Sequence, residues 1–181
     1  MNKAEGLPSP EEAVIILREK GCSVNVINHC KAVAKVAVRI ANRCVENGVS
    51  VNVRLVQNGA LLHDLGRSET QGIRHAVVGA DIARSLKLPE PIIAIIERHI
   101  GGGITAQEAA GIGLPVKSYM PVTIEEKIVS YADKLVEGNR VVRIEETVLK
   151  LREELGTDHP AAKRVMALHR EISALCLESD D

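Results

Sequence analysis

The sequence predicts an all-α protein in which residues 1–181 form one compact helical domain. Apolar residues recur at three- and four-residue steps along most of the chain, the spacing of a helix that buries one face. Helix-start sequences and helix-ending glycines separate these periodic stretches. No long stretch alternates in the manner of a strand, because the alternation at residues 49–53 is short and lies between two predicted helices. A length of 181 residues suits one domain with its own core.

The predicted helices follow one another through short connections. The first begins at Ser9, which can cap it, has Pro10 in its first turn and stops at Gly21. Thr123 and Glu126 have the spacing of a capping box at a later helix. In chain order the predicted helices cover residues 10–20, 24–47, 52–65, 75–86, 92–100, a short piece after 105, 123–136, 145–155 and 161–177.

The composition narrows the classes of function. Hydrophobic residues make up 45% of the chain, but there is no Trp and no Phe, and there are only two Tyr. Such a chain offers no aromatic platform on which the bases of a single-stranded nucleic acid could stack. The net charge is -1, and Lys and Arg are spread along the whole chain. We therefore expect no nucleic-acid partner, whereas a small phosphorylated molecule held by a metal ion and one or two basic groups is compatible with this composition.

The cysteine spacing and the lack of long apolar segments indicate where in the cell we expect the protein. Cys22, Cys30, Cys44 and Cys176 show no CxxC spacing, so we expect reduced thiols rather than a zinc finger or a disulfide framework. The N-terminus is polar and lacks the apolar segment of a signal peptide. No stretch approaches the roughly 18 consecutive apolar residues of a membrane span. The sequence thus predicts a cytoplasmic protein without membrane contact.

Several residues have the chemistry of ligands for a divalent metal ion. His63 and Asp64 are adjacent at the end of a predicted helix and offer one imidazole and one carboxylate. Leucines flank Asp64, and a bare carboxylate among them is costly unless it is paired or bound to metal. Asp133 borders the apolar stripe of a later helix, and His29 lies on the apolar stripe of the helix at 24–47. Each has an ordinary alternative, since a lone His is commonly a hydrogen-bonded core residue and a lone Asp a cap, an ion-pair partner or an exposed residue.

In their order along the chain, these residues resemble the pattern of the HD superfamily of metal-dependent phosphohydrolases. That pattern has a His on an early helix, an adjacent His-Asp pair at the end of a later helix and a distant Asp on a late helix. The segments that carry the resemblance are residues 58–67 (Asn-Gly-Ala-Leu-Leu-His-Asp-Leu-Gly-Arg), 75–80 (His-Ala-Val-Val-Gly-Ala), 95–99 (Ile-Ile-Glu-Arg-His) and 130–135 (Ser-Tyr-Ala-Asp-Lys-Leu). The resemblance covers about residues 25–143, and it leaves the first helix and the last two as accessory elements. The subgroup looks nearest to stand-alone HD proteins similar to the symmetrical dinucleoside tetraphosphate hydrolases.

The resemblance implies a metal site and a reaction. It implies that His29, His63, Asp64 and Asp133 bind one divalent metal ion, for which Mn, Fe, Co, Ni, Mg and Zn are all candidates. It also implies that a metal-activated water hydrolyses a phosphoester or phosphoanhydride bond in a small nucleotide-like substrate, with Asp64 in the catalytic centre.

Four further residues near these motifs have two interpretations each. His75 and His99 either ligate a second metal ion, with Asp64 as the bridge, or bind phosphate and act as general acid. Many family members carry a further His or a Thr after the position of His99. Here Ile100 and three glycines follow His99, and this departure from the family pattern argues against a standard second metal site. Arg67 and Lys134 are predicted to contact a substrate phosphate, and a solvent-facing basic side chain is the alternative for each.

Two classes without catalysis stand beside the enzyme. One is a non-catalytic metal- and nucleotide-binding helical module. The other is a purely structural helical protein whose His residues are hydrogen-bonded in the core and bind no metal. The helices at 145–155 and 161–177 either complete the core or form a homodimer contact.

Overall fold

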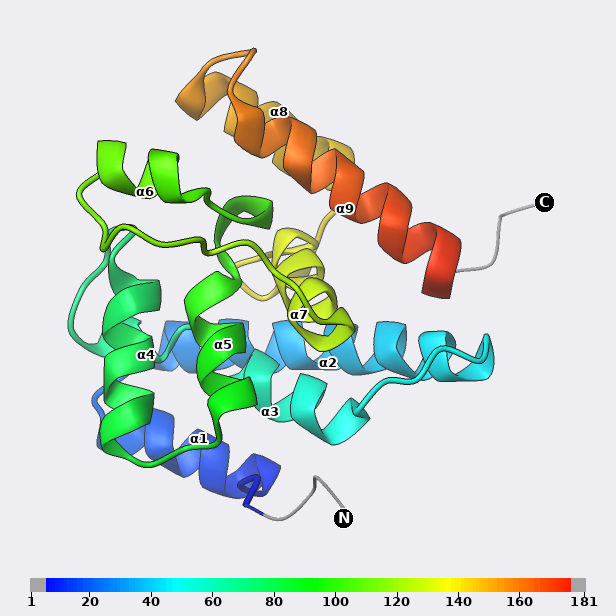
Figure 1. The fold of residues 1–181 in the computed structure, drawn as a ribbon. Coiled ribbons are helices and arrows are strands. Elements are labelled where there is room, and N and C mark those ends of the chain that lie inside the picture. Colours follow the sequence, from blue (N-terminus) through cyan, green and yellow to red (C-terminus); the bar gives the residue numbers. More distant parts are fainter. Residues whose placement is uncertain (1–5, 177–181) are drawn as a thin grey trace.

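The computed structural model describes residues 6–176 and has the all-α architecture that the sequence predicts (Figure 1). Its α-helices are α1 (Pro10–Glu19), α2 (Val24–Glu46), α3 (Val53–Leu62), α4 (His75–Ser85), α5 (Glu90–Arg98), α6 (Ala106–Gly111), α7 (Ile124–Lys134), α8 (Ile144–Leu155) and α9 (Pro160–Cys176). Two short 3-10 helices and two short strands complete the described part: η1 (Leu65–Ser68), η2 (Ile100–Gly102), β1 (Val136–Glu137) and β2 (Arg140–Val141). Within residues 6–176, no helix combines the length and the apolar character that a membrane span requires.

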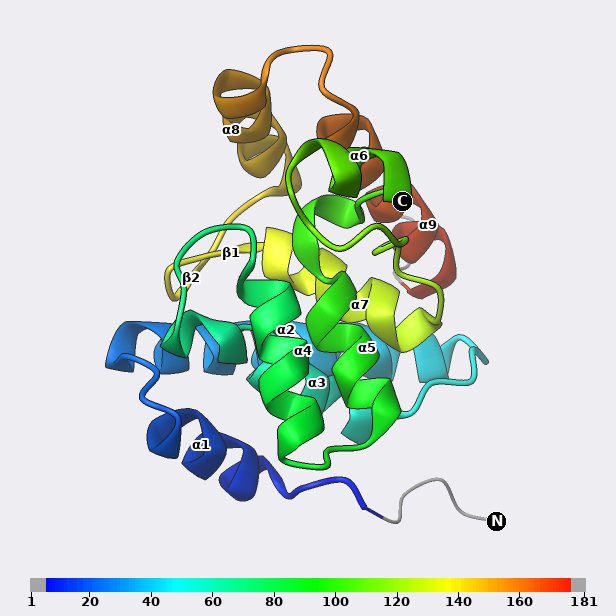
Figure 2. The ribbon, with the colours of Figure 1, turned by 60° about the vertical axis from the view of Figure 1, so that its left-hand side comes forward.

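The longest helix, α2, is the centre of the fold. Its apolar stripe is buried, and α3, α7 and α9 all pack against it. Helix α1 lies on α3, while α4 and α5 pair with each other and α5 contacts both α3 and α7 (Figures 1 and 2). Helices α8 and α9 lie side by side at one end of the molecule. Because the chain has no Phe or Trp, this core is built mainly from Leu, Ile, Val and Ala.

Helix α3 ends three residues before its predicted end. Leu62 is its last residue, His63 follows as the C-cap, and Asp64 has left helical geometry with φ -97 and ψ 18. Two adjacent residues inside one helix would point about 100° apart. The break after Leu62 frees both side chains to turn toward the same interior space.

A β-hairpin replaces the simple helix end that the sequence predicts at Gly138. Strands β1 and β2 are antiparallel, with Val136 opposite Val141 and Glu137 opposite Arg140. The turn between them contains Gly138, whose φ of +60 lies in the left-handed region that favours glycine. Strands of two residues are too short to give an alternating pattern, which explains why the sequence does not reveal them.

The predicted capping box at α7 is only half formed. Thr123 caps the helix by accepting a hydrogen bond from the backbone N–H of Glu126 at 3.3 Å. The Glu126 carboxylate accepts instead from the backbone N–H of Val122 at 2.7 Å and from Arg98 at 3.0 Å. Glu126 is buried, and a buried carboxylate gains more from a charged partner than from a second backbone donor.

The expectation of four reduced thiols is wrong for one pair of cysteines. Cys44 near the end of α2 and Cys176 at the end of α9 form a disulfide between two fully buried residues. Cys22 and Cys30 are free and buried. The bonded residues are 132 positions apart, so no local spacing could reveal the pair. Only the packing of α9 against α2 brings them together.

Gly66 and Gly79 allow η1 to lie directly on α4. A Cβ atom placed on Gly66 would overlap the backbone oxygen of His75 and would come within 2.5 Å of the Gly79 backbone nitrogen. A Cβ atom on Gly79 would lie 2.9 Å from the backbone nitrogen of Gly66. These two glycines therefore permit a close backbone approach, and that approach brings Asp64 next to His75.

Replacing Gly66 by Ala is expected to lower the free energy of unfolding by about 3 kcal/mol, the upper end of the usual cost of overpacking, because the obstructing atoms are backbone. Urea denaturation measures the change. Gly111→Ala is the matched control, since nothing lies within 4 Å of a Cβ atom added there. Equal stability of the two variants would contradict the close approach of η1 and α4.

Candidate metal centre

Six side chains from different helical segments meet in one place. Each lies within two residues of a helix end or in the first turns of a helix, where a side chain can leave the helix packing. They are His29 in α2, His63 and Asp64 just after α3, His75 at the start of α4, His99 just after α5 and Asp133 near the end of α7. The structure thus brings together every residue that the sequence indicated as a metal ligand or catalytic group.

All four histidines are oriented in the same way by a backbone carbonyl. A carbonyl oxygen can only accept a hydrogen bond, so the Nδ1 atom that contacts it carries the hydrogen. The four Nδ1 contacts are His29 to Gly138 O at 2.8 Å, His63 to Ala60 O at 2.7 Å, His75 to Gly72 O at 2.8 Å and His99 to Ile96 O at 2.7 Å. Each Nε2 atom therefore faces the centre with a lone pair that can bind a metal ion.

Asp133 forms the first group of donor atoms. Its Oδ1 atom lies 3.0 Å from His29 Nε2 and 3.5 Å from His63 Nε2. One donor atom from each of these three residues lies within 4.8 Å of the other two. Two imidazoles and one carboxylate at this spacing can share one metal ion.

Asp64 lies between this group and a second one. Its Oδ2 atom lies 3.7 Å from His63 Nε2 and 4.0 Å from His29 Nε2. Its Oδ1 atom lies 3.1 Å from His75 Nε2 and 3.7 Å from His99 Nε2. The two carboxylate oxygens thus face different pairs of imidazoles, which is the placement of a bridging ligand.

The donor set fits a metal ion on two observations. His63 Nε2 and Asp64 Oδ1 are buried polar atoms without a hydrogen-bond partner among the described residues, and such atoms are costly unless something binds them. The Nε2 atoms of His75 and His99 lie 3.0 Å apart although both rings carry their hydrogen on Nδ1. Two lone pairs at that distance repel unless a proton or a cation lies between them. Two nitrogen ligands of one ion, each at about 2.1 Å, are about 3 Å apart when they are at right angles.

The electrostatics of the centre keep both carboxylates ionised. Burial raises the pKa of Asp64, but the nearby His63, His75 and His99 lower it by more, so it stands well below its ordinary value. Burial likewise raises the pKa of Asp133, while Lys134 and the nearby His29 and His63 bring it well below its ordinary value. Ionised carboxylates are the form that binds divalent cations.

His63 and His99 have opposite shifts. Burial lowers the pKa of His63, but Asp64, Cys30 and Asp133 raise it, so it stands well above the ordinary value of a histidine. Burial lowers the pKa of His99, and the nearby His63 and His75 lower it further. A neutral imidazole is the form that binds metal, so His99 is ready to ligate whereas His63 must release its proton first.

Arg67 and Lys134, the predicted phosphate contacts, both line the pocket above the centre. Arg67 Nε donates to Asp64 Oδ2 at 2.8 Å, and its guanidinium also donates to Gln71 O at 3.0 Å. Lys134 Nζ donates to Asp133 Oδ2 at 2.6 Å. Each cation is therefore already paired with a carboxylate of the centre, so it can reach a phosphate only while it shares or exchanges that partner.

The pocket above the centre has a volume of about 350 Å³ and includes residues that the sequence did not indicate. Val136, Glu137 and Val142 come from the hairpin region, and Thr147, Lys150 and Leu151 come from α8. The backbone oxygen of Gly138 is equally unexpected, although it orients His29 from 109 residues away. The periodicity of a helix shows which of its faces is apolar, but not which distant element that helix packs against. Only the three-dimensional packing therefore reveals that α8, the hairpin and the Gly138 oxygen contribute to the site.

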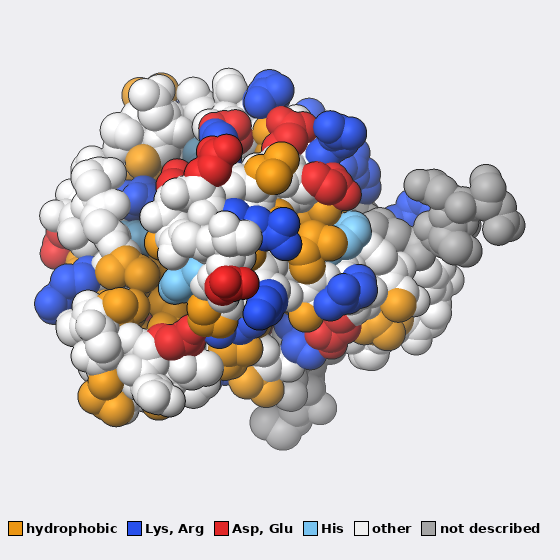
Figure 3. Space-filling view, turned by 90° about the horizontal axis from the view of Figure 1, so that it is seen from above, with side chains coloured by type: hydrophobic (Ala, Val, Ile, Leu, Met, Phe, Trp, Pro, Cys, Tyr) orange, Lys and Arg blue, Asp and Glu red, His pale blue; other side chains and the backbone are white. Residues whose placement is uncertain are grey.

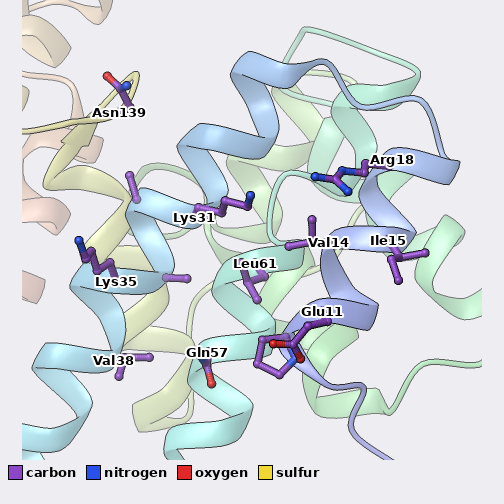
Figure 4. Close-up of a pocket in the computed structure, with 13 residues that line it drawn as sticks. Glu11, Val14, Ile15, Arg18, Lys31, Lys35, Val38, Gln57, Leu61 and Asn139 are labelled. Atoms are coloured by element: carbon purple, nitrogen blue, oxygen red, sulfur yellow. The ribbon is translucent and has the colours of Figure 1, made fainter.

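A second cavity is larger but lies elsewhere. It occupies about 930 Å³ between α1, α2 and α3, and no histidine or aspartate lines it. Figure 4 shows Arg18 on α1 and Lys31 and Lys35 on α2 around the apolar Val14 and Leu61. None of its residues belongs to the metal-binding groups, so the chemistry of the side chains identifies the smaller pocket as the site.

The family described as HD domain matches residues 26–138. An uncharacterized protein of Methanocaldococcus jannaschii, MJ0778, is 48% identical over 165 residues, which is 91% of this chain and 97% of that one. A tRNA (cytidine(56)-2'-O)-methyltransferase of Picrophilus torridus is 42% identical over 94% of this chain, but this chain spans only 48% of that protein.

Among solved structures, the HD domain of the Listeria monocytogenes phosphodiesterase PgpH in complex with cyclic-di-AMP has a TM-score of 0.53. The match covers 94% of this chain and 99% of that one at 17% identity, so it establishes the fold. None of these relatives or structures is named as a dinucleoside tetraphosphate hydrolase, so the expected likeness to that subgroup is not supported.

Proposed function

This chain belongs to the HD domain family, and we propose that it is a metal-dependent phosphohydrolase acting on a small nucleotide-like substrate. The observation that carries the proposal is the position of Asp64. Its two oxygens face separate pairs of imidazoles, and Oδ1 is buried without a hydrogen-bond partner. Arg67 satisfies only the Oδ2 atom, and a buried, ionised Oδ1 is costly unless a cation binds it.

The protein side of the mechanism follows from the same contacts. His29, His63 and Asp133, together with Asp64, would hold one ion, and His75 and His99, together with the same Asp64, would hold a second. Divalent ions bound there would supply Lewis-acid activation of a phosphoryl oxygen and of water. Arg67 and Lys134 would orient the phosphate oxygens by moving from their carboxylates onto the substrate. The backbone carbonyls that hold each Nδ1 fix the four rings before substrate arrives.

Of the two roles open to His75 and His99, ligation of a second ion has the better support. Both Nε2 atoms face Asp64 Oδ1 and each other within 3.7 Å. A general acid would instead have to face the leaving group. The lowered pKa of His99 also favours a neutral ligand over a proton donor.

Activity measurements with controlled metal content test the proposal. Protein stripped with EDTA is reloaded with Mn, Fe, Co, Ni, Mg or Zn and assayed with cyclic di-AMP, linear pApA, diadenosine tetraphosphate and a short RNA. We expect hydrolysis of at least one small nucleotide with at least one metal and none after stripping. Metal binding without hydrolysis of any substrate would contradict the enzyme.

That outcome would favour a non-catalytic metal- and nucleotide-binding module. The observation in favour of this second function is that the chain matches only 48% of a relative named for a different reaction, the methylation of tRNA. In such a protein an HD domain accompanies another activity. Hydrolysis of the RNA alone would contradict the small-nucleotide substrate and the expectation of no nucleic-acid partner.

A further inference from the structure

Helix α8 lies outside the segment that matches the HD family, yet it forms the outer wall of the pocket. We infer that α8 and the hairpin next to it form a subsite for the base of a nucleoside, outward from the phosphate that would sit on the metal centre. This inference rests on the proposed phosphohydrolase function and narrows its substrate class to nucleoside phosphates and phosphodiesters.

One face of α8 is turned into the pocket. Thr147, Lys150, Leu151 and Glu154 line it, and their spacing of three and four residues places them on the same side of the helix. Ile144 and Val148 are buried on another side. Thr147 Oγ1 donates to the backbone oxygen of Lys134 at 2.6 Å. Since Lys134 follows Asp133 directly, this bond fixes α8 relative to the metal centre.

The wall offers an apolar surface opposite the ionic floor. Val136 and Val142 from the hairpin region line the pocket but are only 7% and 8% exposed, so its apolar surface comes mainly from the partly buried Leu151 of α8. Apolar side chains around a ligand pocket bind the non-polar body of the ligand, while a few polar groups fix its orientation. A heterocyclic base has a flat apolar face and polar edges, so it can contact both the apolar and the polar side chains of this wall.

The charges of the wall argue against a long chain of phosphates. Lys150, which lines the pocket, forms an ion pair with Glu137, which also lines it. Arg67 and Lys134 are already paired with the carboxylates of the floor. No row of unpaired cations therefore leads out of the pocket along the described residues that line it. On the face that α8 and α9 present, basic and acidic side chains are intermixed (Figure 3), whereas a nucleic-acid track needs a basic groove.

The size of the pocket points the same way. A volume of about 350 Å³ is near the lower end for small-molecule sites, which run from about 300 to 1,000 Å³. The pocket thus has room for one small unit next to the metal centre. A free phosphate would leave the apolar wall unused.

Direct binding of three ligands tests the subsite without relying on turnover. AMP, ribose 5-phosphate and inorganic phosphate are titrated calorimetrically into the metal-loaded protein, and the thiophosphate of AMP replaces AMP if AMP is hydrolysed. We expect AMP to bind about tenfold or more tightly than ribose 5-phosphate, because only AMP carries a base to cover the wall. Equal affinities of AMP and ribose 5-phosphate in the unmodified protein would overturn the subsite.

Variants of α8 locate the subsite. Leu151→Ser and Lys150→Gln should each reduce the preference for AMP over ribose 5-phosphate to about threefold or less and leave phosphate binding unchanged. The matched controls on the same helix are Leu149→Ser and Arg152→Gln. Leu149 is 57% exposed, and neither residue lines the pocket. The controls should keep the preference of the unmodified protein.

The outcomes separate the subsite from the proposed function. A preference for AMP that depends on Leu151, in a protein without phosphohydrolase activity, would keep the subsite and reject the enzyme. Activity on small nucleotides with no preference for AMP, or with a preference unaffected by both α8 variants, would keep the enzyme and reject the subsite. Thermal denaturation of all four variants checks folding, and Lys150→Gln serves as the informative variant if Leu151→Ser is unfolded, because Lys150 is exposed.

Discussion

Replacing Asp64 by Asn is expected to remove metal from both groups of ligands and to lower the rate of phosphate-ester hydrolysis by about a thousandfold or more. The two oxygens of Asp64 face His63 and His29 on one side and His75 and His99 on the other. An amide has nearly the same shape but no charge, so it cannot balance two cations. Loss of several kcal/mol of transition-state stabilisation corresponds to a rate loss of that size. Metal content by mass spectrometry and initial rates measure both effects.

Two further variants make the result specific. Asp133→Asn should lose metal only from the group formed with His29 and His63, so it should retain more metal than Asp64→Asn. Asp81→Asn is the matched control, because its side chain is 68% exposed and forms an ion pair with Arg84 on the protein surface. It should keep full metal content and activity. An Asp64→Asn variant with unchanged metal content and rate would mean that the buried carboxylate is structural and that hydrolysis does not use this centre.

Reducing the disulfide between Cys44 and Cys176 is expected to lower the free energy of unfolding by about 4 to 5 kcal/mol. The bond closes a loop with a sequence separation of 132, and a cross-link of that length strongly restricts the unfolded chain. For a protein of this size the melting temperature should fall by about 10 °C or more. Thermal denaturation with and without dithiothreitol measures the shift.

The double variant Cys44→Ala, Cys176→Ala is the control for the reductant. It should melt at a low temperature in both conditions, since Cys22 and Cys30 remain free thiols in either case. Metal binding should survive below the melting transition, because Cys44 is 15 residues from His29 and so about 22 Å along α2. Four titratable thiols in the denatured, unreduced protein would restore the expectation of reduced cysteines.

The helices and the candidate ligands are accessible from the sequence because their signals are local. The three- and four-residue spacing of apolar side chains shows where α2 and α7 run and places His29 and Asp133 at the edges of their buried faces. The glycines at 66 and 79 stand in recognisable motifs, although only the structure shows that they let η1 lie on α4.

Local sequence patterns do not predict the helix boundaries that determine the geometry of the site. The early end of α3 depends on how His63 and Asp64 are held by partners from α4 and α7, and not on a helix-breaking residue before them. In the same way, Glu126 leaves its predicted capping position because Arg98 of α5 lies within reach. In both places a tertiary contact outweighs the local preference.

Local patterns along the chain are enough to show that this protein is helical and which side chains could bind a metal ion. The packing of distant elements is needed to show that Asp64 faces two pairs of imidazoles, that Gly138 orients His29, that α8 lines the pocket and that Cys44 meets Cys176. The difference lies in the range of the interactions. Periodicity and capping act over a few residues, whereas these contacts join elements that are far apart in the chain and meet only when the core is packed.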